Sequence, residues 1–195
     1  MWALVESNSV SKIYTRPEGI TLGDVQYPSN IFTMWSESEL NAISIYTITI
    51  NNSNLKDSEY YYNTDITYTY SSSGSGSVTG AYGSPTAKSL DDTTSTVNGK
   101  SSTVLGLKSV HKSKINSTAN TLLQKYDWYT LRAASGGTAV PSSVTTYQAA
   151  VRTKANSMCT QVDNAINVDA LAALYVYNDD DPPIRPLGEF PDEPS

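Results

Sequence analysis

Apolar and polar residues follow two different periods along this chain, and the period changes near residue 100. Up to about Lys100 the apolar residues alternate with polar ones in short runs that are separated by turn residues. From about Thr103 they recur at every third or fourth position. A two-residue period is typical of strands, whereas a 3.6-residue period is typical of amphipathic helices. The pattern therefore predicts an α+β protein with segregated halves: a β-rich domain over residues 1–100 and a helical module over residues 101–177.

The first part carries strand signals with tight connections, which predict an antiparallel sheet. The apolar runs 2–5 and 10–14 are expected to form a hairpin, followed later by strands over 45–50, 60–70 and 78–82. A Gly/Ser-rich loop separates the last two runs, so they should pair as a long hairpin. One short helix is expected within this part. Its start is marked by Ser36 and Glu39, which form a capping-box pattern, and it should end near Ile43.

The second part should contain four helices, two long and two short. The first long helix carries a stripe that consists of Leu107, His111, Ile115, Ala119 and Leu122. A short helix should follow around Asp127 and Trp128. The second long helix begins at Pro141, which suits a first helical turn. Its stripe consists of Val144, Tyr147, Val151, Ala155, Met158, Val162 and Ile166. Asn167 is expected to cap the final short helix.

Residues 178–195 differ in composition from both parts, since they are acidic and rich in proline. We call this segment the tail. It offers little apolar surface to offset an ordering entropy of about 1–2 kcal/mol per residue. The tail should therefore be extended and disordered in the isolated protein, and protected only in an assembly. Leu187 and Phe190 are its two candidate anchors.

Charge and composition exclude several classes of partner. The chain of 195 residues has a formal net charge of -6 and a pI of about 4.7, without a Lys/Arg block, so we expect no nucleic-acid partner. No apolar run approaches the roughly 20 residues of a membrane-spanning helix, so we expect no membrane partner. The sequence around Met1 lacks the features of a signal peptide, which predicts a protein made and used in a cytoplasm. The single Cys159 excludes an internal disulfide.

Catalytic and metal-binding chemistry has little support in the sequence. His111 and Cys159 could form a nucleophilic pair, but each lies on the apolar stripe of a helix, where packing is the more common role. Two such ligands do not complete a tetrahedral zinc site. The run of three aspartates at 179–181 lacks the glycine turn and the distal glutamate of a calcium loop. We therefore expect no catalytic residue, no metal site and no cofactor.

Aromatic residues are the better candidates for a functional surface. Tyr60, Tyr62, Tyr68 and Tyr70 crowd one hairpin, and alternation along a strand should turn some of these rings outward, Tyr60 and Tyr62 among them. Outward tyrosines are typical of protein interfaces, although they also stack on sugars or pair with each other across a plain hairpin. In the helical part, Asp127 is expected to be an N-cap, and Trp128 to be wedged between two helices.

The helical part also carries a recognisable order of residues. Leu122 and Leu123 are followed by Asp127-Trp128, then by Pro141, Tyr147 and Arg152. This order resembles the C-terminal module of phage tail assembly chaperone proteins, which carry a Leu-Leu pair, an Asp-Trp and a Tyr-Arg-x-x-(Leu/Val)-Arg run. The run here reads Tyr-Gln-Ala-Ala-Val-Arg, so Gln148 replaces the first arginine. The residues that carry the resemblance, from Leu122 to Arg152, span about a sixth of the chain.

The opening of the chain is similar to phage proteins that carry the same module. The similarity rests on Met-Trp-Ala-Leu-Val at residues 1–5, Tyr27-Pro28, the Ile-Phe-x-x-Trp run at 31–35 and Glu39-Leu40. Together the two resemblances imply a tail or tail-fibre assembly protein that binds a structural tail partner in the host cytoplasm, without catalysis. On this hypothesis the β-rich half supplies the partner-binding surface, and the module organises subunits or clients around Trp128.

Two other functions remain open on the sequence alone. The chain could be a structural component retained in the virion tail, such as an adaptor subunit, in which a partner or a second copy holds the acidic tail. More remotely, it could be an enzyme that acts on host glycans. That activity requires two carboxylates at a shared cleft, and no carboxylate pair stands out.

Overall fold

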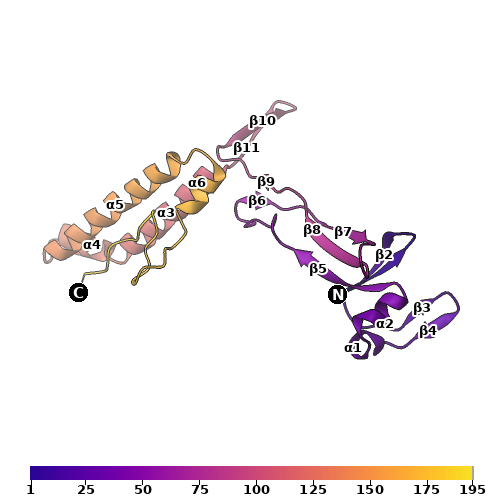
Figure 1. Cartoon of the computed structure of the whole chain (residues 1–195). Coiled ribbons are helices and arrows are strands. Elements are labelled where there is room, and N and C mark those ends of the chain that lie inside the picture. Colours follow the sequence, from indigo (N-terminus) through magenta and orange to yellow (C-terminus); the bar gives the residue numbers. More distant parts are fainter. Residues whose placement is uncertain (195) are drawn as a thin grey trace. The chain divides into compact units, whose positions relative to one another are not determined.

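The computed structural model describes residues 1–194 and divides into two compact units, Met1–Thr86 and Ala87–Ser195 (Figure 1). Ser195, the last residue of the predicted tail, lies outside the described residues. Strands dominate the first unit, and the second contains a hairpin and four helices. This mixture of strand and helix confirms the predicted α+β class.

The first unit is built around one five-stranded sheet. Its strands, in spatial order, are β2 (Ser9–Tyr14), β1 (Trp2–Glu6), β5 (Ile45–Asn51), β8 (Ser77–Tyr82) and β7 (Ile66–Ser71). The sheet is mixed rather than antiparallel throughout, because β5 and β8 run parallel. The two edge strands, β2 and β7, contact each other, so the sheet curls on itself.

Backbone conformation explains the two hairpins of this sheet. Ser7 and Asn8 join β1 to β2, and both have positive φ (50° and 61°), as a type I′ turn requires. In the second hairpin, β8 passes close to its neighbours at Gly80. A Cβ atom there would lie 2.8 Å from Ile50 and 2.9 Å from Tyr68, so glycine is what permits the close approach.

Both faces of the sheet are covered, because β1 sends apolar side chains to both sides. Trp2 and Leu4 pack on a cluster formed by Tyr14, Ile20, Ile31, Phe32, Leu40 and Ile45. That face is covered by α1 (Ile31–Met34), α2 (Glu37–Ala42) and the pair β3 (Ile20–Leu22) and β4 (Val25–Tyr27), as Figure 1 shows. The predicted capping box at the start of α2 is present. Ala3 and Val5 join Ile48 and Val78 in a second cluster on the other face.

The tyrosines of the β7 region are more buried than the sequence predicts. Tyr60 is only 6% exposed, so the prediction that its ring faces outward is wrong. Tyr68 and Tyr70 pack against the second apolar cluster, and the Tyr70 hydroxyl lies 3.2 Å from that of Tyr46. Tyr62, in β6 (Tyr61–Tyr62), is 64% exposed. The curl of the sheet turns the alternating face of β7 inward, which periodicity alone does not reveal.

The second unit starts with a hairpin that the sequence analysis missed. After β9 (Thr86–Ala87), which pairs with β6, the strands β10 (Thr93–Val97) and β11 (Lys100–Val104) form an antiparallel ribbon. Asn98 and Gly99 both have positive φ at its turn. Every residue of the two strands is exposed, so no apolar alternation marks the ribbon in the sequence.

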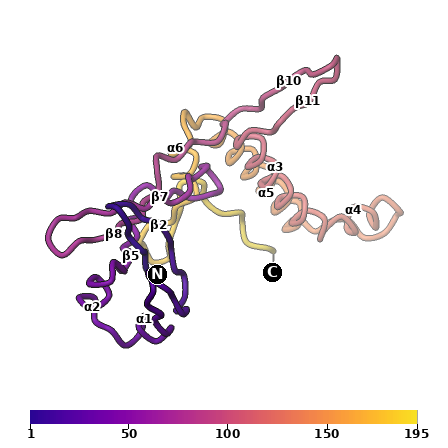
Figure 2. Tube along the Cα trace, turned by 90° about the vertical axis from the view of Figure 1, so that its right-hand side faces the viewer, coloured from indigo at the N-terminus to yellow at the C-terminus, as the bar shows by residue number. Residues whose placement is uncertain are grey.

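Four helices follow as predicted: α3 (Leu107–Gln124), α4 (Asp127–Ala134), α5 (Ser142–Asp163) and α6 (Val168–Ala173). Figures 1 and 2 both show α3 and α5 running alongside each other, with α4 at one end of the pair. The predicted stripes form the seam between α3 and α5, except that Ile166 is 85% exposed. Helix α5 ends at Asp163, so Ile166 lies beyond the helical repeat and Ala165 is buried instead. Asn167 caps α6 as expected.

The tail folds back onto the helices, which corrects the prediction that it is disordered in the isolated chain. Leu187 is 2% exposed, and its backbone N–H donates to the Leu174 carbonyl at 3.0 Å. The Lys154 Nζ atom donates to the Leu187 carbonyl at 2.9 Å. Phe190 is half-buried. A single deeply buried anchor and hydrogen bonds to its backbone therefore order a segment whose composition alone would leave it unfolded.

Candidate functional site: an aromatic row on α4 and α5

Helix α4 stands apart from the other helices of its unit because none of its residues is buried. Trp128 is 50% exposed and Leu131 is 69% exposed. An exposed tryptophan beside an exposed leucine is unusual on a solvated helix and is typical of interaction surfaces.

Trp128 belongs to a continuous line of four rings that starts in the core. Tyr147 on α5 is buried and meets Tyr126 edge-on, with ring centroids 5.3 Å apart. Tyr126 stacks on Tyr129 at 6.3 Å, and Tyr129 lies 3.8 Å from Trp128. We call Tyr147, Tyr126, Tyr129 and Trp128 the aromatic row. The row leads from a buried end at Tyr147 to an exposed end at Trp128.

Arg132 fixes the exposed end of the aromatic row. Its guanidinium carbon lies 4.8 Å from the Trp128 ring and 5.1 Å from the Tyr129 ring, within the range of cation–π contacts. The turn after α4 folds back over this arginine: Gly136 has a φ of 83°, and the Gly137 N–H donates to the Arg132 carbonyl at 3.0 Å. This is a glycine-terminated helix end of the Schellman type. It holds Arg132, and with it Trp128, while half of the Trp128 side chain stays exposed.

Beside the aromatic row, α4 and α5 form an open groove of about 360 Å³. Its walls are formed by Asp127, Thr130, Leu131, Gln148 and Arg152. The groove thus combines an apolar side chain with one anionic group, one amide and one cationic group. Such a mixture can bind a peptide segment with both backbone hydrogen bonds and a side-chain charge.

At the buried end of the row, the tail closes over Tyr126 and Tyr147. Glu193 accepts a hydrogen bond from Lys125 Nζ and a second one, at 3.3 Å, from the Tyr126 hydroxyl. The hydrogen bond from Lys125 lowers the pKa of Glu193, and the same contact raises the pKa of Lys125. A cleft of about 460 Å³ lies there, formed by Ser142, Ser143, Thr146, Tyr147, Ala150, Pro191, Asp192 and Pro194.

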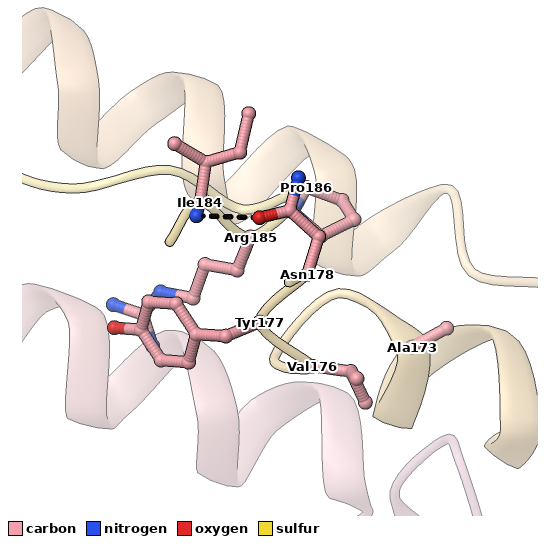
Figure 3. A pocket seen from close by; sticks show the side chains of 7 residues that line it. All are labelled: Ala173, Val176, Tyr177, Asn178, Ile184, Arg185 and Pro186. Carbon is pink, nitrogen blue, oxygen red and sulfur yellow. Dashed lines mark hydrogen bonds between the residues drawn. The ribbon is translucent and has the colours of Figure 1, made fainter. Parts of the chain in front are cut away.

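A separate cleft of about 520 Å³ lies where the tail leaves α6 (Figure 3). Its walls are mostly apolar, formed by Ala173, Val176, Tyr177, Asn178, Ile184, Arg185 and Pro186. Its polar groups bond within the chain: the Ile184 N–H donates to Asn178 Oδ1 at 2.8 Å, the dashed line in Figure 3. The Tyr177 hydroxyl donates to Glu189 at 2.7 Å, and Arg185 pairs with the same carboxylate.

His111 and Cys159 make contacts with different neighbours. The buried His111 ring lies 4.8 Å from the Tyr175 ring, whereas Cys159 Sγ lies 3.8 Å from Asn116 Oδ1. Burial raises the pKa of the Cys159 thiol, which favours the protonated and less nucleophilic form. Within residues 1–194, no group of three or more His, Cys, Asp or Glu side chains could hold a metal ion.

Some of the predicted site residues come together, and two take roles other than those predicted. Asp127 and Arg152 share the groove, and Trp128 and Tyr147 share the aromatic row. Asp127 is not an N-cap, because Tyr126 occupies that position and no side chain caps α4. The carboxylate of Asp127 instead lies in the first helical turn, where its negative charge interacts favourably with the positive end of the helix dipole. Trp128 is not wedged between helices, because it packs on Tyr129 and Arg132 at the surface.

Tyr126, Tyr129 and Arg132 were not among the residues predicted from the sequence. Their spacing could have revealed them: residues three and four apart lie on one face of a helix, as Tyr126 and Tyr129 do, and as Trp128 and Arg132 do. No sequence signal links Glu193 to Lys125, because the tail reaches α3 through a fold-back that depends on the buried Leu187.

Comparison of this chain with family models, curated proteins and solved structures found no match. Across residues 1–194, none of the helices has both the length and the apolar character that spanning a lipid bilayer requires.

Proposed function

We propose that this protein is a phage tail or tail-fibre assembly protein that binds a structural tail partner through the surface of α4 and α5, without catalysis. The observation that carries the proposal is the exposed end of the aromatic row. Trp128 is half-exposed, yet Tyr129 and Arg132 already fix its orientation. A tryptophan that is ordered before binding loses little conformational entropy when a partner covers it.

The resemblance to tail assembly chaperones supports the same surface. Its residues Asp127, Trp128, Tyr147 and Arg152 come from two helices, and the fold brings them into the aromatic row and the adjoining groove. Leu131 and Trp128 supply apolar contact area, while Arg152 and Asp127 supply charge at the rim. This arrangement suits a client segment that would otherwise aggregate through its own apolar side chains.

Tyr62 is the exposed tyrosine of the β unit that can still serve as a second contact, as first expected for Tyr60, Tyr62, Tyr68 and Tyr70.

The proposal places the protein in the host cytoplasm during assembly. Retention in the virion tail as an adaptor subunit is the alternative. That alternative was supported by the expectation that only a partner could order residues 178–195. The contacts of Leu187 with the helices weaken this support, because they order the segment within the chain. The three clefts described above contain at most one carboxylate each, which gives no support to glycan hydrolysis.

The test is a pull-down of tail and tail-fibre proteins from infected cells with tagged protein. We expect Trp128→Ala to reduce recovery of a tail protein more than tenfold, about 1.4 kcal/mol. The melting temperature should hardly change, because Trp128 is half-exposed and α4 has no buried residue. Ile166→Ala is the matched control, since it removes a large exposed apolar side chain from the same unit outside the site.

Equal recovery with Trp128→Ala and with the unmodified chain would contradict the proposal. Mass spectrometry of purified virions then separates the two roles. Absence of the protein from virions supports a transient assembly factor, whereas stoichiometric presence supports the adaptor subunit.

A further inference from the structure

The tail forms part of the wall of the cleft at the buried end of the aromatic row, through Pro191, Asp192 and Pro194. Residues 191–194 lie against the start of α5, and Glu193 bonds to both Lys125 and Tyr126. The tail is thus held there by one ion pair and by the two prolines, Pro191 and Pro194, which line the cleft. Both partners of the ion pair are about half-exposed, so water screens their attraction and the pair can open readily.

One polar group in this cleft is left without a partner. The Tyr147 side chain is only 5% exposed, and among residues 1–194 its hydroxyl has no hydrogen-bond partner. A buried hydroxyl in that state costs about 1–3 kcal/mol. The chain's own tail therefore matches Lys125 and Tyr126 but not Tyr147. A ligand that places an acceptor near the Tyr147 hydroxyl would gain a contact that the tail does not make.

We propose that the surface formed by Lys125, Tyr126 and Tyr147, together with the cleft beside Tyr147, is a docking site for an extended acidic segment of the partner, and that residues 191–194 cover it when the partner is absent. We call this surface and its cleft the Lys125 cleft. The inference rests on the function proposed above and specifies the chemistry of the partner. Lys125 supplies the cation, and the hydroxyls of Tyr126 and Tyr147 supply two donors. All three groups select an acceptor-rich, negatively charged segment.

The Lys125 cleft is continuous with the proposed client surface, because Tyr126 and Tyr147 belong to the aromatic row. A partner segment could therefore contact Trp128 with one part and displace the tail with another. Because the tail competes within the same molecule, its effective concentration is on the order of millimolar, and the partner must exceed that competition.

The experiment uses the full chain and a labelled, end-capped peptide with the sequence of residues 189–194 as the probe, with binding followed by fluorescence anisotropy. Glu193→Gln weakens the contact between the chain's own tail and Lys125. This variant should therefore bind the peptide about fivefold more tightly than the unmodified chain. Lys125→Met should abolish the gain. Tyr147→Phe should leave peptide binding in the Glu193→Gln background unchanged and should not lower the melting temperature, because the peptide has the sequence of the tail and the tail makes no hydrogen bond to that hydroxyl.

Asp179→Asn is the matched control, because it removes the same charge from the tail at a residue outside the Lys125 cleft. It should bind the peptide as the unmodified chain does. Equal peptide affinity of the Glu193→Gln variant and the unmodified chain would overturn the inference. So would a concentration-dependent dimer of the unmodified chain that Glu193→Gln dissolves, since the occupant would then be a second copy.

The peptide assay contains no phage protein, so its result is independent of the pull-down. Tighter peptide binding by Glu193→Gln together with a failed pull-down would support the docking site for an acidic segment. It would also reject a phage tail protein as the partner. A successful pull-down together with an unchanged peptide affinity would preserve the proposed function and reject the Lys125 cleft.

Discussion

The two units of this protein use their aromatic residues in opposite ways. In the β unit, Tyr68 and Tyr70 pack against an apolar cluster of the curled sheet, and Tyr60 is buried as well. In the helical unit, the seam between α3 and α5 uses up the regular apolar stripe and leaves α4 without a buried residue. A curled sheet encloses an interior in which rings can pack. Two paired helices have one seam between them, and most of their surface remains outside it. Exposed aromatic side chains therefore indicate function more reliably in the helical unit.

The sharpest test of this contrast compares two neighbouring tyrosines of the β unit. Tyr60→Ser should lower the free energy of unfolding by about 3–5 kcal/mol, because it removes a ring that is 6% exposed. Tyr62→Ser should change it by less than about 0.5 kcal/mol, since that ring is 64% exposed. Urea denaturation measures both. Similar, small losses for the two variants would show that the β unit leaves both rings outside its core.

A second comparison sets one isoleucine from each unit against the other. Ile45→Ala should cost about 2–5 kcal/mol, because Ile45 is fully buried between β1 and α2. Ile166→Ala should cost less than about 0.5 kcal/mol, because that side chain lies beyond the end of α5. Thermal denaturation followed by circular dichroism gives both values. A large loss for Ile166→Ala would restore the uninterrupted stripe that the sequence predicts.

Helix caps provide a smaller comparison, within the helical unit. Asn167→Ala should cost about 1 kcal/mol, because the Asn167 side chain accepts from the Ala170 N–H at 2.7 Å. Asp127→Ala should cost only about 0.3 kcal/mol, since Asp127 contributes through the helix dipole and not as a cap. Equal losses in urea denaturation would mean that Asp127 caps α4 after all.

The smallest expected effect concerns the pH dependence of the tail contact. The hydrogen bond from Lys125 lowers the pKa of Glu193 from its ordinary value of 4.5, so the contact stabilises the fold above that pH and is lost as the pH falls through the lowered value. The same bond raises the pKa of Lys125 from 10.5, so its contribution is lost again as the pH rises through the raised value. Hydrogen exchange of the tail amides should show protection between these limits. Protection that is unchanged in Glu193→Gln across the same pH series would detach the tail from this ion pair.

Local rules in the sequence predict much of the fold. The capping box of Ser36 and Glu39, the alternation around Ile48 and the cap at Asn167 all act within a few residues, and all are present. The β10–β11 ribbon was missed because its strands lack apolar alternation. Its Asn98-Gly99 turn, however, is a strong hairpin signal.

The remaining features depend on contacts between residues that are distant in sequence. Tyr68 and Tyr70 pack inward because the sheet curls, and the tail is ordered because Leu187 is buried against the helices. The candidate site depends partly on local sequence and partly on distant contacts. Asp127, Trp128, Tyr147 and Arg152 could be named from their order in the chain, but the support from Arg132 and the cover from Glu193 depend on the turn after α4 and on the fold-back of the tail.

The parallel pairing of β5 with β8 sets the order in which the sheet can be completed during synthesis. β1 and β2 can pair as soon as both leave the ribosome, because Ser7 and Asn8 join them directly. β8 lies between β5 and β7, and Ile48 must wait for Val78 before it gains its partner on that side. Until then the β5 edge stays open, and an open edge readily pairs with other chains. Residues 77–82 are therefore the last piece of the sheet to be added, and a nascent chain that stalls before Tyr82 is itself prone to aggregation.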